Sequence, residues 1–181
     1  MKIIETSLKD CYIIEPTIFE DKRGYFYEKF NEEKFESLTG LNGHFVQDNI
    51  SKSSYGVLRG LHLQKGEHAQ AKLVSCLEGK VWDVAVDLRK DSPTFGKSFG
   101  VELTAENKVQ FYVPRGFGHG FSVLSETAVF AYKCDNFYNK ESEGGVLWND
   151  EDLQIDWKLP AKDVILSEKD KIQPTFAEKN Y

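Results

Sequence analysis

Short apolar runs separated by turn residues are the feature that most constrains how this chain can fold. The clearest run covers residues 80–88, Lys-Val-Trp-Asp-Val-Ala-Val-Asp-Leu. Every second residue from Trp82 to Leu88 is apolar, whereas Asp83 and Asp87 fall on the opposite face. A period of two residues is that of an extended strand, so this run predicts a β-strand.

Similar runs recur at close spacing along most of the chain. The other predicted strands cover residues 12–14, 25–30, 45–50, 73–77, 98–103, 109–113, 120–124 and 128–134. Helix signals are few: Asn31 is suited to cap a helix over 32–38 that ends at Gly40, and Ser167 opens a short turn or helical start. Many short strands with weak helix signals predict an all-β antiparallel sandwich or barrel with a few short peripheral helices.

Composition narrows the class of protein further. The net charge of −6 argues against nucleic acid or an anionic membrane as partner, although a few converging cations would still hold a small phosphorylated ligand. Three scattered cysteines do not form a disulfide framework, and their odd number suits a reducing compartment. Neither a signal peptide nor an apolar run of membrane length is visible. We therefore expect a cytoplasmic protein with one domain over residues 1–181.

The four histidines indicate whether a site in this chain would bind a metal or perform acid–base catalysis. In an extended strand, His62 and Gln64 share a face with Gly60, and glycines flank His119. His62, His68 and His119 would give three nitrogens to zinc or iron, but Gln64 is a poor ligand for those metals. Acid–base chemistry fits better, because histidine is the usual base near neutral pH. We expect no metal site.

Seven motifs follow one another in a fixed order. They lie at residues 19–28, 47–51, 56–64, 68–74, 87–96, 114–121 and 147–150. Pro114, Gly116 and His119 have the Pro-x-Gly-x-x-His spacing that is general among cupins. With these motifs the sequence resembles the dTDP-4-dehydrorhamnose 3,5-epimerases, cofactor-free deoxysugar epimerases of the cupin class, from about Tyr12 to Asp170.

The resemblance implies a fold, an activity and a partner chain. The implied fold is a cupin jelly-roll β-barrel or sandwich. The implied activity is epimerisation at carbons 3 and 5 of a dTDP-4-keto-6-deoxyhexose without a cofactor. The implied assembly is a homodimer in which the N-terminal strands of one subunit, roughly residues 1–50, complete the pocket of the other.

The resemblance also assigns roles to residues. His62 matches the base, Asp170 its carboxylate partner, Tyr132 the proton donor, and Lys72 a group beside the substrate oxygens. The residues that match substrate contacts are Arg23, Glu28, Gln47, Asp48, Asn49, Arg59, His119, Tyr138, Glu143 and Lys169. Leu63 stands where the family often has an aromatic residue, and Ala71 where glycine is expected before the lysine; both leave room for altered substrate preference.

Three alternatives to a 3,5-epimerase stay open. A related enzyme acting at one carbon only would use the same base and pocket. A metal-dependent cupin, such as a dioxygenase or a metal-assisted isomerase, would use histidine ligands. A non-catalytic sugar-nucleotide binding module would need neither Tyr132 nor Asp170.

Overall fold

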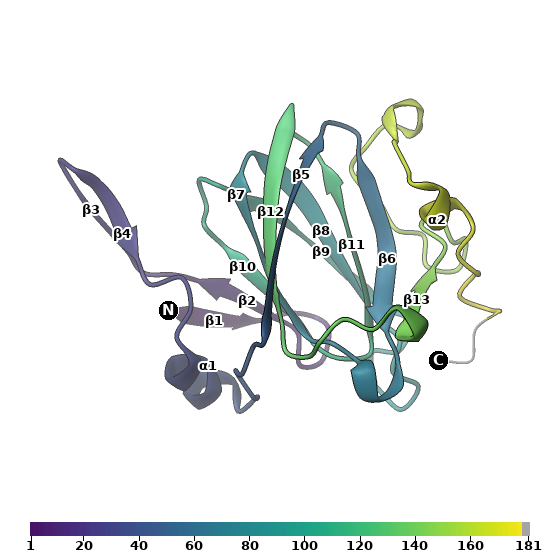
Figure 1. Cartoon of the computed structure of the whole chain (residues 1–181), viewed down its shortest axis with the longest axis horizontal. Helices are drawn as coiled ribbons and strands as arrows, with labels where there is room; N and C mark the ends of the chain where they lie inside the picture. The colour runs from purple at the N-terminus through teal and green to yellow at the C-terminus, as the bar shows by residue number, and fades with distance from the viewer. Residues whose placement is uncertain (179–181) are drawn as a thin grey trace.

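Two antiparallel β-sheets face each other and make up most of the computed structural model, which describes residues 1–178 (Figure 1). The last residues of the expected domain, 179–181, lie outside the described part. The first sheet has the order β1-β2-β10-β7-β12-β5 and the second β13-β6-β11-β8-β9, while β3 and β4 form a separate hairpin. The all-β sandwich that the strand pattern predicts is confirmed.

The strands and helices have the following bounds. The first sheet contains β1 (Lys2–Glu5), β2 (Tyr12–Glu15), β5 (Gln47–Ser54), β7 (Lys72–Glu78), β10 (Gln110–Val113) and β12 (Thr127–Cys134). The second contains β6 (Leu58–Gln64), β8 (Lys80–Asp87), β9 (Ser98–Thr104), β11 (Phe117–Val123) and β13 (Glu143–Val146). The remaining elements are β3 (Ile18–Asp21), β4 (Gly24–Tyr27), α1 (Glu32–Thr39), α2 (Glu168–Lys171) and the 3₁₀ turns η1 (Gly66–His68), η2 (Lys140–Ser142) and η3 (Ala161–Asp163).

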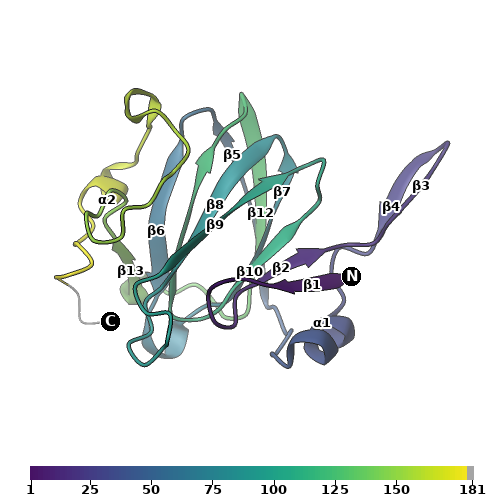
Figure 2. The same ribbon diagram turned by 180° about the vertical axis from the view of Figure 1, so that it is seen from behind.

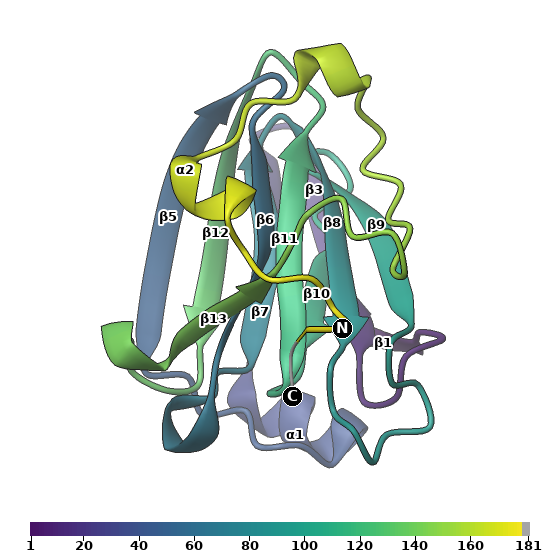
Figure 3. The ribbon, with the colours of Figure 1, turned by 90° about the vertical axis from the view of Figure 1, so that its right-hand side faces the viewer.

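The strand β8 is buried on both faces. Val81 and Ala85 point into the core between the sheets, whereas Val84 and Val86 pack under the C-terminal segment beside Trp157. Figure 3 shows this segment crossing the outer face of the second sheet. The alternation in the sequence correctly predicted the strand, but the face that carries its aspartates lies inside the protein.

The outer face of the first sheet is covered near α1. The Asn31 side chain accepts a hydrogen bond from the Lys34 backbone N–H at 3.0 Å, and Gly40 ends the helix with φ 70°. Both helix-boundary predictions are therefore confirmed. The fully buried Phe35 packs against Tyr112 with ring centroids 5.1 Å apart. No helix within residues 1–178 is long and apolar enough to span a bilayer.

The β3–β4 hairpin projects away from the sheets (Figures 1 and 2). Its aromatic side chains Phe19 and Phe26 are 62% and 68% exposed, and their rings lie 6.5 Å apart. An apolar pair of this size in water favours a partner surface.

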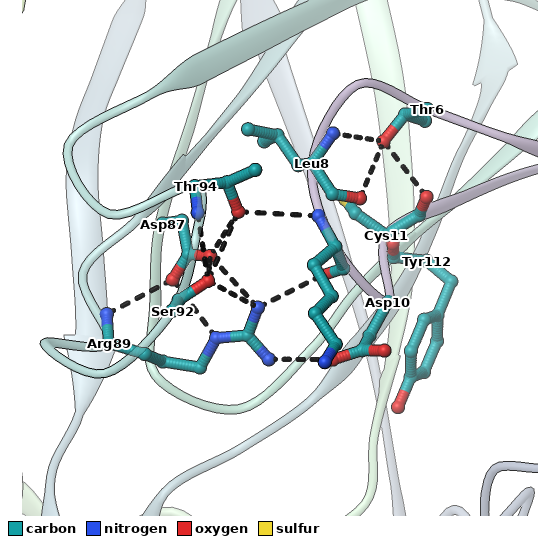
Figure 4. A network of polar contacts seen from close by, with 10 residues as sticks. Thr6, Leu8, Asp10, Cys11, Asp87, Arg89, Ser92, Thr94 and Tyr112 are labelled. Carbon is teal, nitrogen blue, oxygen red and sulfur yellow. Dashed lines mark hydrogen bonds and ion pairs between the residues drawn. The ribbon is translucent and has the colours of Figure 1, made fainter.

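A polar network joins the loop after β8 to the β1–β2 turn (Figure 4). The fully buried Asp87 accepts hydrogen bonds from Arg89, Ser92 and Thr94. Arg89 also donates to Asp10 at 2.9 Å. Burial raises the pKa of Asp87, but the hydrogen bonds outweigh burial and hold the pKa below its ordinary value.

Candidate active site

A cavity of about 550 Å³ lies between the inner faces of the two sheets. Side chains from β5, β6, β7, β11, β12 and β13 line it, together with the segment that contains α2. All four residues expected to be catalytic, His62, Lys72, Tyr132 and Asp170, are among them.

His62 and Asp170 form a close ionisable pair in the cavity. The Nε2 atom of His62 lies 2.6 Å from Oδ1 of Asp170, although the two residues are 108 positions apart. The Gly60 backbone N–H donates to the same oxygen at 3.0 Å, and the Ser167 hydroxyl donates to Oδ2 at 2.6 Å. A Cβ atom on residue 60 would stand 2.9 Å from Oδ1, so a glycine there lets the carboxylate approach the strand.

The surroundings of Asp170 favour its charged form. Burial by itself raises the pKa of this carboxyl group. The hydrogen bonds from His62, Ser167 and Gly60 act in the opposite direction and bring the pKa to about 2. Asp170 is therefore ionised near neutral pH.

A register shift in β6 lets Arg59 line the cavity together with His62. Across β11, His119 pairs with His62, but Phe121 pairs with Arg59, so Gly60 and Leu61 stand opposite Gly120. Strict alternation would place Arg59 and His62 on opposite faces, whereas the shift lets both line the cavity. The Arg59 guanidinium donates to Ser53 at 3.3 Å.

Lys72 and Tyr132 occupy the first-sheet side of the cavity, on the neighbouring strands β7 and β12. Burial lowers the pKa of Lys72, even though Asp83 works against this shift. Burial also raises the pKa of Tyr132, which keeps its phenol protonated. Within residues 1–178 the Lys72 ammonium makes no hydrogen bond or ion pair, and Lys72 lines the cavity.

A second histidine–aspartate pair lies deeper. Nε2 of His119 is 2.9 and 3.0 Å from the two oxygens of the fully buried Asp83. Sequence reasoning missed Asp83 as a functional partner. The available signal was that Asp83 lies inside an otherwise apolar run of sequence. A carboxylate that such a strand buries needs a partner.

Further polar residues expected to bind substrate also line the cavity. Gln47 donates to Asn49 at 3.0 Å and accepts the Tyr138 backbone N–H at 3.2 Å. Glu143 and Lys169 form an ion pair at 2.6 Å. Burial raises the pKa of Glu143, but the hydrogen bonds from Lys169 and Tyr138, together with the Lys169 charge, hold that pKa below its ordinary value.

Comparisons with known proteins place this geometry in a family. The family model for dTDP-4-dehydrorhamnose 3,5-epimerase matches residues 5–178. The chain belongs to the dTDP-4-dehydrorhamnose 3,5-epimerase family. A relative of that name from Shigella flexneri is 52% identical over 181 residues, which is all of this chain and 99% of the relative.

Two solved structures are closely similar to the chain. The dTDP-4-dehydrorhamnose 3,5-epimerase of Elizabethkingia anophelis is 80% identical, with a TM-score of 0.98 over 100% of this chain and 99% of that one. The dTDP-6-deoxy-D-glucose-3,5-epimerase of Legionella pneumophila, in complex with dTDP-4-keto-L-rhamnose, is 50% identical, with a TM-score of 0.94 and coverages of 99% and 94%. The expected cupin jelly roll is confirmed.

Three residues that the epimerase resemblance assigned to substrate lie outside this cavity. Asp48 points to the other face of β5, because neighbouring strand residues alternate, and it pairs with Lys133 at 2.9 Å. Arg23 pairs with Asp21 on the projecting hairpin, and Glu28 pairs with Lys34 at 2.7 Å.

The three histidines considered as metal ligands do not converge in this epimerase-family chain. Nε2 of His62 contacts Asp170, Nε2 of His119 contacts Asp83, and Nε2 of His68 lies 3.1 Å from the Asn139 side chain. Within residues 1–178 no three histidine, cysteine or acidic side chains come together as a metal-ligand set.

Proposed function

We propose that this protein is an isomerase that converts dTDP-4-dehydro-6-deoxyglucose to dTDP-4-dehydrorhamnose by inverting carbons 3 and 5. The supporting observation is that one cavity receives a carboxylate-held imidazole, a phenol and a buried ammonium: His62, Tyr132 and Lys72. The full-length similarity to 3,5-epimerases supports the same reaction. We assign the reaction to the supply of dTDP-rhamnose for polysaccharide.

The chemistry follows from the position of the ketone. Carbons 3 and 5 both flank the carbonyl at carbon 4, so loss of a proton from either one gives an enolate with charge on the same oxygen. Lys72 is assigned to that oxygen. A preorganised donor where charge develops contributes about 2.7–4 kcal/mol in related oxyanion sites. Because the carbonyl accepts the electron pair, this route needs no redox cofactor.

The hydrogen bond to Asp170 decides which nitrogen of His62 acts as base. When Asp170 accepts the proton on Nε2, the neutral ring carries its lone pair on Nδ1. Nδ1 then removes the proton from carbon 3 or 5, and Asp170 stabilises the resulting imidazolium. Tyr132 returns a proton from the other side of the ring, a role suited to a phenol that burial keeps protonated.

Binding of the diphosphate is assigned to cations. Arg59 lines the cavity, and its planar fork matches phosphate oxygens. Arg23 and Glu28, which lie away from the cavity of their own chain, are assigned to the cavity of a second copy in a homodimer that exchanges its N-terminal strands. The exposed Phe19 and Phe26 support this arrangement. The unpaired thiols of Cys11, Cys76 and Cys134 support a reducing location, the cytoplasm.

Proton NMR in heavy water tests the function directly. The purified protein is incubated with the 4-keto-6-deoxyglucose nucleotide, and deuterium uptake at carbons 3 and 5 is followed beside product formation. The proposal expects uptake at both carbons with accumulation of the rhamno product. Uptake at one carbon would identify a single-carbon epimerase, and tight binding without exchange would identify a binding module.

A further inference from the structure

Gln64 lines the cavity, but within residues 1–178 the hydrogen bonds of its side chain are made to the backbone of the protein itself. Its Nε2 atom donates to the backbone carbonyls of His68 at 2.8 Å and Phe137 at 3.1 Å. Its Oε1 atom accepts the Asn139 backbone N–H at 2.7 Å. Both amide protons are used, and the side chain is buried, so Gln64 has no N–H to donate to a ligand.

The loop that Gln64 contacts is held by hydrogen bonds from several side chains. Residues 135–139 connect β12 to η2 in irregular conformation. Gln70 donates to the Asn136 carbonyl at 2.7 Å, and Gln47 accepts the Tyr138 N–H at 3.2 Å. Gln64 contacts two of the five residues and is the most buried of the three glutamines. The Asn136 and Asn139 side chains also anchor the loop, to the Glu67 carbonyl and to His68. Gln64 is the side chain that bonds the backbone on both sides of Tyr138, at Phe137 and Asn139.

This loop presents aromatic side chains beside the cavity. Phe137 is 66% exposed and Tyr138 is 55% exposed, and Tyr138 lines the cavity. The Tyr138 side chain also makes a hydrogen bond to Glu143. The backbone of residues 137–139 sets where each ring begins, so fixing that backbone contributes to fixing the aromatic wall of the cavity.

Gln64 and His62 lie two residues apart on β6 and so project from the same face of the strand. One strand thus carries the proposed base and the side chain that anchors the aromatic wall. We propose that Gln64 is a positioning residue. It fixes the distance between the aromatic side chain of Tyr138 and His62, and so preorganises the site for the nucleoside diphosphate. The inference rests on the proposed function, because it takes Tyr138 as the aromatic beside the nucleotide.

The expected consequence is a loss of affinity rather than of chemistry. Without the amide, the loop keeps its hydrogen bonds through Asn136 and Asn139 but loses both contacts beside Tyr138. Part of the ordering then falls to the ligand at the moment of binding, and that cost weakens binding. The base and its carboxylate are untouched, so turnover of bound substrate continues. A change in KM with little change in kcat is the signature of lost ground-state binding.

The experiment compares Gln64→Met with a matched variant in a remote loop. Methionine keeps the length of the side chain but makes none of the three hydrogen bonds. Asn107 likewise holds a turn by three hydrogen bonds, to the backbone of Glu102, Thr104 and Val109, and it does not line the cavity. Asn107→Leu is therefore the control for loss of an amide that supports a loop.

We expect Gln64→Met to weaken binding of thymidine diphosphate about tenfold by calorimetry and to raise KM to the same extent, with kcat within twofold of wild type. Amide exchange across residues 135–142 speeds up in Gln64→Met alone. Asn107→Leu leaves affinity, KM and kcat unchanged. Gln64→Glu, which keeps the size and the acceptor but loses both donors, serves as the second variant if the methionine variant does not fold.

The inference is overturned if the loop exchanges faster while thymidine diphosphate binds as in wild type, or if kcat falls as much as KM rises. It is also overturned if Asn107→Leu weakens nucleotide binding equally. A wild type that binds thymidine diphosphate but never exchanges substrate protons contradicts the proposed function alone. In that case the calorimetric comparison still decides the role of Gln64.

Discussion

Asp87 and Asp170 are two buried carboxylates that accept hydrogen bonds on both oxygens, yet their surroundings differ in one respect. Asp87 faces Arg89, a permanent cation whose other donors are bound to Asp10 and to the Lys9 carbonyl. Asp170 faces His62, whose ring is 29% exposed and lines the cavity. Arginine is a fixed cation, whereas histidine is the side chain that proteins most often use to accept and release protons.

This difference separates structural from chemical use of the same residue type. A carboxylate saturated by an arginine and hydroxyls stabilises the junction of two loops. A carboxylate saturated by an imidazole at a cavity wall keeps that imidazole oriented for proton transfer. Substitutions in the two clusters are therefore expected to affect different measurements.

The largest expected effect is on catalysis at His62. His62→Ala removes the proposed base and is expected to lower kcat toward the upper end of about 10²–10⁴-fold. Binding of thymidine diphosphate, measured by calorimetry, should survive. Turnover close to wild type in this variant would show that His62 is not the base.

Arg89→Ala should act on stability instead. Removing one partner of a buried ion pair costs about 3–5 kcal/mol in unfolding free energy, because the other charge is left uncompensated. Urea unfolding measures the loss, and kcat of the folded protein should stay within twofold. The milder Thr94→Val removes one hydrogen bond to Asp87 and keeps the test open if the alanine variant does not fold. A loss of kcat without a loss of stability in either variant would contradict a purely structural role for the Asp87 cluster.

Tyr132→Phe probes the other side of the proposed site. The phenyl ring keeps the packing but loses the donated proton, so product formation should fall by about 10² or more, while deuterium uptake through His62 falls less. Isotope uptake and product are followed in the same NMR experiment. Equal losses in both would count against the donor role.

The smallest effect is a pH dependence of stability at Asp170. Its pKa of about 2 lies below the ordinary value of 3.8, so its stabilisation is complete above about pH 4 and is lost as pH falls through 2. Between pH 5 and pH 2, wild type should lose about 2 kcal/mol more unfolding free energy than Asp170→Asn. Urea titrations at several pH values measure it, and parallel pH curves for the two proteins would contradict it.

Local signals in the sequence predicted the elements of the fold well. The alternation in β8, the cap at Asn31 and the stop at Gly40 all act over a few residues, so short windows reveal them. The strands β1, β3, β6 and β13 were missed. In β13 the glycine pair Gly144-Gly145 suggests a turn, and only pairing with β6 makes the segment a strand.

The site was less accessible to the sequence because its geometry depends on distant segments. No spacing rule brings Asp170 to His62 across the chain; that pairing came from family resemblance. The register shift beside Gly60 and the inward direction of Asp83 follow from strand pairing. The placement of Asp48 outside the cavity follows from strand alternation, because Gln47 and Asn49 on either side of it line the cavity.

The route of the C-terminal segment over the second sheet has a consequence for synthesis and turnover of the protein. Every strand of both sheets ends by Val146, yet the carboxylate that orients His62 arrives only with α2. On the proposed mechanism, a growing polypeptide that has just completed its last strand therefore still lacks the carboxylate partner of its base. Equally, a single proteolytic cut ahead of Ser167 would break the chain between the strands and Asp170, and the proposed mechanism then predicts a loss of activity.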